Sequence, residues 1–152
     1  MAELKVGQKA PDFTLESDSG EMVTLSKLKG QKVILFFYPK DMTPGCTVEA
    51  CDFRDNYTRF RKMGVAVYGI SKLDVKSKAK FREKHKLNYP LLADEDLKTV
   101  TAYGILKDKV MYGKKVKGIE RTTVLVGEDG KILRIWPKVQ IEGHVDEVLK
   151  SV

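Results

Sequence analysis

The sequence lacks several features that assign a protein to a class at once. Its 152 residues include only two cysteines, two histidines and one tryptophan, with no internal repeat and no low-complexity run. No apolar stretch approaches the ~18 residues of a membrane span, and the first six residues lack the basic start and apolar core of a signal peptide. We therefore expect a single domain over residues 1–152, located in the cytoplasm, with no membrane partner.

The charge balance is basic, but it points to no particular partner. The net charge is +7 and the isoelectric point is near 9.3, yet the lysines are spread along the whole chain. A solvated basic surface is therefore expected, and no nucleic-acid partner, because no interleaving of aromatic and basic residues is present.

Strands and helices alternate along the chain and predict an α/β protein with a mixed central sheet flanked by helices. The expected strands are 32–38, 65–71, 90–93, 120–126 and 131–136, and the expected helices are 46–63, 76–86, 97–103 and 144–149. Residues 13–15 and 22–25 predict an N-terminal β-hairpin. This order of elements is compatible with a thioredoxin-like fold.

Both cysteines lie where an apolar strand is expected to turn into a helix. Thr43 followed by Pro44 is a helix-start signature, because a threonine oxygen can cap an unpaired backbone N–H and proline at the first helical position loses no hydrogen bond. Cys46 then falls in the first helical turn, at the position that a capping box gives to an acidic residue. The positive end of the helix dipole is expected to favour a Cys46 thiolate.

The spacing of the two cysteines restricts what they can do together. Cys46 and Cys51 are five residues apart, which in an intact helix places them about 140° apart around the axis and roughly 8 to 9 Å apart between Cα atoms. A disulfide needs a Cα separation of no more than about 7 Å. If both cysteines lie on the helix, we expect their oxidation to require local unfolding.

Other uses of the cysteines remain open at this point. A metal site would need two more ligands, and only His85 and His144 are available, on separate expected helices. We expect His85 to be a solvated helix residue and His144 to begin the last helix. A thiol–disulfide exchange protein stays possible, although its usual motif has two residues between the cysteines instead of four.

Activation of a nucleophilic cysteine normally needs a base or a fixed positive charge nearby. No local pairing of cysteine with histidine is encoded, so an arginine is expected to take this part, with Arg54 and Arg121 as candidates. Arg121 stands at the start of an expected buried strand, where a charged residue is costly unless it has an anionic partner.

The segment around the cysteines closely resembles the active-site segment of the peroxiredoxins. The pattern consists of Pro39, Thr43 and Cys46 in the spacing Pro-x-x-x-Thr-x-x-Cys. Cys51, five residues further on, resembles the second cysteine of the branch called bacterioferritin comigratory protein, or Q-type.

Other parts of the chain carry the same resemblance. Residues 9–15 look like the usual opening of the family, and 121–123 look like the segment that bears its essential arginine. Residues 112–118 look like the loop that leads to the arginine strand, and we expect the lysines in this loop to be solvated.

The resemblance implies a thioredoxin fold and a peroxidase that reduces hydrogen peroxide and organic hydroperoxides. It implies that Cys46 is the peroxidatic cysteine and Cys51 the resolving cysteine, and that Thr43 and Arg121 position and polarise the peroxide. Pro39 would shield the pocket from water, and Glu49 matches an acidic position of the branch. The resemblance also implies no metal, haem or flavin, a thioredoxin-like reductant, and a monomer or weak homodimer.

Overall fold

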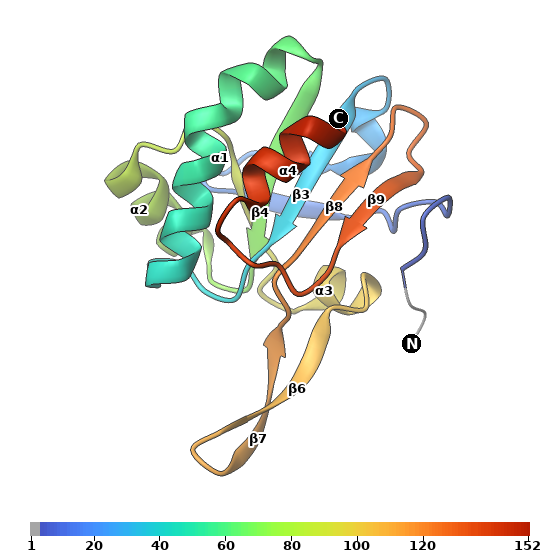
Figure 1. Cartoon of the computed structure of the whole chain (residues 1–152). Coiled ribbons are helices and arrows are strands. Elements are labelled where there is room, and N and C mark those ends of the chain that lie inside the picture. Colours follow the sequence, from blue (N-terminus) through green and yellow to red (C-terminus); the bar gives the residue numbers. More distant parts are fainter. Residues whose placement is uncertain (1–3) are drawn as a thin grey trace.

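The computed structural model describes residues 4–152 of the chain; residues 1–3, part of the segment that argued against a signal peptide, lie outside them. Among the described residues, one sheet is formed by β1 (Thr14–Ser17), β2 (Met22–Thr24), β3 (Lys32–Phe37), β4 (Val65–Ser71), β5 (Leu91–Ala93), β8 (Thr122–Val126) and β9 (Ile132–Trp136). Its strand order is β2-β1-β5-β4-β3-β8-β9, with β3, β4 and β5 parallel and the other pairs antiparallel (Figure 1). The expectation of a mixed sheet with an N-terminal hairpin is confirmed.

Helices cover both faces of this sheet. The helices are α1 (Pro44–Lys62), α2 (Val75–His85), α3 (Lys98–Ala102) and α4 (His144–Ser151), and a short 3₁₀ turn, η1 (Leu25–Leu28), follows β2. Residues of α1, α2 and α4 share one buried cluster with one face of β3 and β4, whereas residues of α3 and the N-terminal segment share a second cluster on the opposite face. The connections between the parallel strands, β3 to β4 through α1 and β4 to β5 through α2, therefore place both helices on the same side of the sheet.

The central position of β3 explains its composition. It pairs with β4 on one side and β8 on the other, and every residue from Val33 to Phe37 is buried. A strand covered on both faces is expected to be apolar without alternation. The next element, α1, then begins at Pro44 and ends before Gly64, whose positive φ of 74° terminates the helix.

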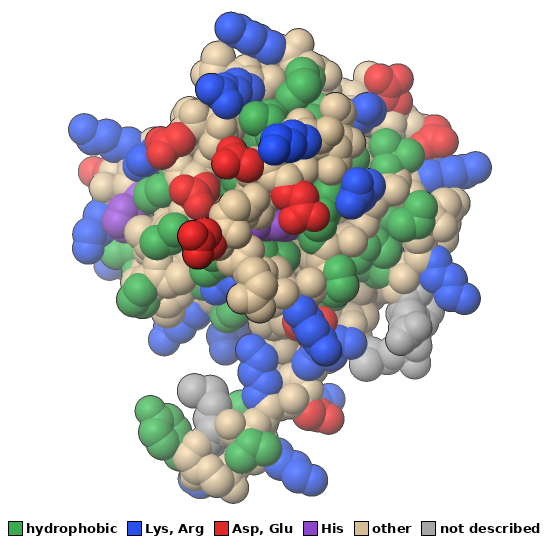
Figure 2. Space-filling view, in the orientation of Figure 1, with side chains coloured by type: hydrophobic (Ala, Val, Ile, Leu, Met, Phe, Trp, Pro, Cys, Tyr) green, Lys and Arg blue, Asp and Glu red, His purple; other side chains and the backbone are tan. Residues whose placement is uncertain are grey.

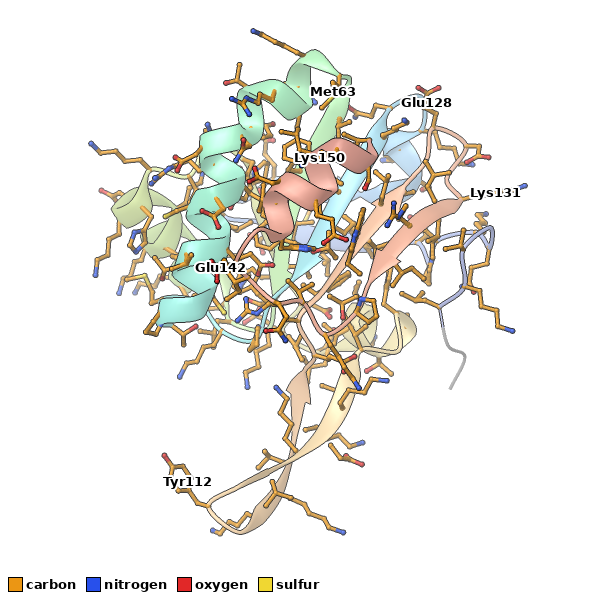
Figure 3. The ribbon with its side chains drawn as sticks, viewed as in Figure 1. Met63, Tyr112, Glu128, Lys131, Glu142 and Lys150 are labelled. Atoms are coloured by element: carbon orange, nitrogen blue, oxygen red, sulfur yellow. The ribbon has the colours of Figure 1, made fainter. Side chains whose placement is uncertain are left out.

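A second, two-stranded sheet was not predicted. β6 (Leu106–Met111) and β7 (Lys114–Ile119) form a hairpin that projects from the body, so the expectation of a loop over 112–118 is wrong. Figure 2 shows hydrophobic and basic side chains on this projection, and Figure 3 places Tyr112 at its tip. The hairpin escaped prediction because its strands alternate lysine with few apolar residues, and in β7 only Ile119, near the base, is buried.

No helix within residues 4–152 has the length and apolar character needed to cross a bilayer.

Candidate active site

The junction between β3 and α1 positions Cys46. The chain leaves β3, passes through a short loop and enters α1 at Pro44, so that Cys46 is the third residue of the helix. Its side chain is buried, with 1% of its surface exposed. The predicted place of Cys46 in the first helical turn is confirmed.

Thr43 lies at the N-cap position, but its hydroxyl does not cap the helix. The backbone of Thr43 is extended, with φ −79° and ψ 152°, as an N-cap requires. Its hydroxyl instead donates to the carbonyl oxygen of Lys40 at 2.9 Å, while the Thr47 hydroxyl donates back to the Thr43 carbonyl at 2.8 Å. The predicted capping bond is therefore wrong: the hydroxyl is engaged in the loop, and α1 receives no side-chain cap from Thr43.

The side chain of Arg121 contacts Cys46, although the two residues are 75 positions apart in the sequence. Arg121 immediately precedes β8. Its carbonyl oxygen accepts a hydrogen bond of 2.9 Å from the backbone N–H of Val139, which fixes the segment after β9 beside Arg121. Its Nη2 donates to Cys46 Sγ at 3.3 Å, and its Nη1 donates to Glu49 Oε1 at 2.7 Å. One guanidinium thus bridges the sulfur and a carboxylate that lie one helical turn apart on α1.

Burial controls the charges of this cluster. It raises the pKa of Glu49 to about 7, although the Arg121 guanidinium opposes the shift. Burial alone would lower the pKa of Arg121, but the Glu49 carboxylate and the Cys46 sulfur beside it raise it instead. Glu49 Oε2 is buried and has no hydrogen-bond partner. Near neutral pH the carboxyl group therefore stands between its charged and neutral forms, while Arg121 stays charged.

Cys51 lies on the same intact helix as Cys46, and both are free thiols. Cys51 is half-buried, and burial raises the pKa of its thiol while Arg54 opposes the shift. Arg54, the other candidate for activating Cys46, donates to the His85 carbonyl oxygen at 2.6 Å and pairs with Asp55. The structure therefore brings Arg121, and not Arg54, to the Cys46 sulfur.

A groove of about 530 Å³ opens beside the start of α1. It is lined by Pro44, Gly45, Val48, Asp52, Ile141, Glu142 and Gly143. A Cβ added to Gly45 would meet Ile141 Cδ1 at 3.1 Å and Arg121 Nη2 at 3.5 Å, so the glycine allows both to approach the helix. Figure 3 shows Glu142 on the chain that passes beside α1. Pro39, at the other side of the loop, is half-buried.

Sequence reasoning missed a buried ionic pair that holds the loop between β3 and α1. Asp41 and Lys78 have fully buried side chains, and Lys78 Nζ lies 3.2 Å from Asp41 Oδ2. Asp41 also accepts hydrogen bonds from Tyr38 and, at 2.8 Å, from Ser77. The available signal was the three-residue spacing of Lys78 and Phe81, which places a lysine on the buried face of α2.

The two histidines lie apart from the cysteines. His85 ends α2 and is half-buried, not solvated, with its ring edge-on to Phe81. His144 begins α4, as expected, but it is buried, and its Nε2 lies 2.8 Å from Thr123 Oγ1. Over residues 4–152, no three His, Cys, Asp or Glu side chains are grouped so as to hold a metal ion.

Comparison with known proteins agrees with this geometry. The profile of the AhpC/TSA family matches residues 6–135. A putative peroxiredoxin bcp of Coxiella burnetii is 56% identical over 96% of this chain and 97% of its own length, and peroxiredoxin Bcp of Bacillus subtilis is 44% identical over 98% and 95%. Among solved structures, Xylella fastidiosa PrxQ, as a cysteine-to-serine mutant, superposes with a TM-score of 0.93 at 33% identity, covering 99% of this chain and 96% of its own.

A further neighbour is the bacterioferritin comigratory protein of Xanthomonas campestris, studied for its reduction of alkyl peroxides. It has a TM-score of 0.91 at 37% identity, and the match covers 97% of this chain and 96% of that one. The chain belongs to the AhpC/TSA family. Within that family it is a peroxiredoxin of the Bcp, or Q-type, branch with a thioredoxin-like fold, and it is a thiol peroxidase.

Proposed function

We propose that Cys46 is the sulfur that attacks the peroxide. The observation that carries this assignment is the bond of 3.3 Å from Arg121 Nη2 to Cys46 Sγ, with the same guanidinium held by Glu49 at 2.7 Å. The fixed guanidinium is placed to stabilise the negative charge that develops on the peroxide oxygen as the O–O bond breaks. The Cys46 sulfur attacks one peroxide oxygen and the O–O bond breaks. The departing oxygen takes up the proton that the thiol has given up and leaves as water or an alcohol, and Cys46 becomes a sulfenic acid.

Thr43 and Pro39 are proposed to position the peroxide and to shield the pocket from water, and their place on the loop before α1 supports this proposal. Thr43 supplies a hydroxyl at the start of the helix, where it can rotate from the Lys40 carbonyl toward a bound peroxide. Pro39 narrows access of water to the pocket. The groove lined by Pro44, Val48 and Ile141 offers apolar surface for the organic part of a hydroperoxide, which supports organic hydroperoxides as substrates besides hydrogen peroxide.

Cys51 is proposed to resolve the sulfenic acid. Its sulfur attacks the Cys46 sulfur, the S–S bond forms, the S–O bond breaks, and the oxygen leaves as water with the Cys51 proton. A thioredoxin-like dithiol then reduces the disulfide by exchange, as a reducing cytoplasm allows. Cys46, Glu49 and Arg121 come from one chain, which fits a monomer or weak homodimer.

Serine variants of the two cysteines test this scheme. Cys46→Ser should abolish peroxide consumption, because no sulfur remains to take the oxygen. Cys51→Ser should keep one rapid turnover, measured by stopped flow, but fail to recycle with thioredoxin. Mass spectrometry should find a Cys46–Cys51 bond in the oxidised parent. Sustained turnover of Cys51→Ser at the parental rate would show that Cys51 does not resolve the intermediate.

A further inference from the structure

The proposed disulfide requires a part of α1 to unwind, and this inference rests on that proposed step. Both cysteines lie in one continuous helix, at a separation too large for a disulfide. The residues between them, 47–50, must leave the helical conformation before the two sulfurs can meet. The contacts of this stretch therefore decide how readily the sulfenic acid is resolved.

The chain on either side of this stretch is fixed to α2 and the loop that follows it, which lie beside α1 (Figure 1). On the N-terminal side, buried Asp41 is held by Lys78 and Ser77. On the C-terminal side, Arg54 Nη1 donates to the His85 carbonyl oxygen at 2.6 Å, and Asn88 Nδ2 donates to the Arg54 carbonyl oxygen at 3.3 Å. Unwinding is thereby confined between two anchored points.

The loop after α2 also makes a contact with the stretch between the cysteines, through Tyr89. The Tyr89 hydroxyl donates to the carbonyl oxygen of Ala50 at 2.7 Å, and both residues are fully buried. The Tyr89 ring is held independently of this bond, edge-on to Phe36 at 5.7 Å and tilted against Tyr57 at 5.8 Å between ring centroids. When the backbone at Ala50 moves, the ring stays and its buried hydroxyl loses its acceptor, which is costly.

We propose that Tyr89 is a positioning residue that holds the segment between the cysteines in its helical form and thereby sets the rate of disulfide formation. Tyr89 acts on the second chemical step and not on the attack on peroxide, because its hydroxyl touches neither sulfur nor Arg121. A slower second step prolongs the life of the Cys46 sulfenic acid. A second peroxide molecule can then oxidise it to the sulfinic acid, losing its own oxygen–oxygen bond and leaving as water or alcohol.

Tyr89→Phe isolates the hydroxyl, and Tyr103→Phe is its matched control. Tyr103 is also a buried tyrosine whose hydroxyl donates to a backbone carbonyl, that of Pro11 at 2.8 Å, but it lies in the cluster on the opposite face of the sheet. Both variants keep the ring and remove one hydrogen bond. A general loss of stability should therefore affect both proteins alike.

The experiment mixes reduced protein with hydrogen peroxide and follows two steps by quenched flow and intact mass spectrometry. For Tyr89→Phe we expect an unchanged rate of sulfenic acid formation and disulfide formation about fivefold faster, the factor that one hydrogen bond of ordinary net strength is worth. The fraction of sulfinic acid at high peroxide should fall accordingly. Tyr103→Phe should match the parent in both rates.

Three results would count against the inference. Disulfide formation in Tyr89→Phe at the rate of Tyr103→Phe would overturn it and leave the proposed function intact. If Tyr89→Phe changes the rates of sulfenic acid formation and disulfide formation by the same factor, the substitution has disturbed the whole site, and the inference is overturned as well. A parent protein that forms no Cys46–Cys51 disulfide would refute the resolving step of the proposed function, and this inference with it.

Discussion

Replacing Glu49 by glutamine should change how the stability of the protein depends on pH. Burial raises the pKa of Glu49 from its ordinary 4.5 to about 7. The folded protein therefore keeps a proton that the unfolded chain has already released between these two values, so the free energy of unfolding falls as the pH rises through this window. At 1.36 kcal/mol per pKa unit, the loss amounts to about 3 kcal/mol once the pH exceeds the folded value.

Glu49→Gln has no proton to lose, so its stability should lack this decline. We expect the difference in unfolding free energy between the variant and the parent to shift in favour of the variant by about 3 kcal/mol between about pH 4.5 and pH 8. Urea denaturation followed by the fluorescence of Trp136 measures both proteins across this range. The lowered pKa of buried His144 acts with the opposite sign but contributes to both proteins and cancels in the difference.

Glu83→Gln provides the control, because Glu83 is exposed on α2. We expect the difference in unfolding free energy between Glu83→Gln and the parent to lack the shift of about 3 kcal/mol expected for Glu49→Gln. Parallel stability curves for Glu49→Gln and the parent would refute the reasoning, since they would mean that Glu49 titrates alike in the folded and unfolded chains.

Two further predictions concern packing around the site. Lys78→Met should lower the free energy of unfolding by about 3 kcal/mol, because Asp41 would be left buried without its cation, and adding Asp41→Asn should restore part of the loss in urea denaturation. Gly69→Ala should cost about 1 to 3 kcal/mol and lower the melting temperature, since its Cβ would lie 2.7 Å from Phe36 Cζ. A melting temperature equal to that of the parent would contradict the tight packing of β4 against Phe36.

The sequence predicted the elements whose burial leaves a strong pattern. β3 is a continuous apolar run from Val33 to Phe37 because both of its faces are covered there. α1 carries apolar residues at steps of three and four because one side packs on the sheet. The β6–β7 hairpin left no such pattern, because most of its side chains face solvent. Lys78 was missed because it resembles its solvated neighbours in a lysine-rich helix, although its three-residue spacing from Phe81 places it on the buried face of α2.

The candidate site likewise has features that local sequence patterns predict and others that depend on the fold. The helix start and the cysteine spacing can be read locally, and Glu49 lies one turn beyond Cys46. Arg121 lies 75 residues from Cys46 in sequence, so its contact depends on the pairing of β3 with β8, which local patterns do not fix. The direction of the Thr43 hydroxyl was out of reach for another reason: a threonine hydroxyl can accept from a backbone N–H at a helix start or donate to a nearby carbonyl oxygen, and the sequence does not fix which bond forms.

The projecting hairpin gives the molecule a natural attachment point. Its tip, Tyr112 and Gly113, is exposed, and its neck is closed by the hydrogen bond of 2.8 Å from the Glu120 N–H to the Ile105 carbonyl oxygen, next to Arg121. A peptide tag or fluorophore grafted at the tip would stand about 20 Å from the neck, and exposed loop tips of this kind tolerate insertions.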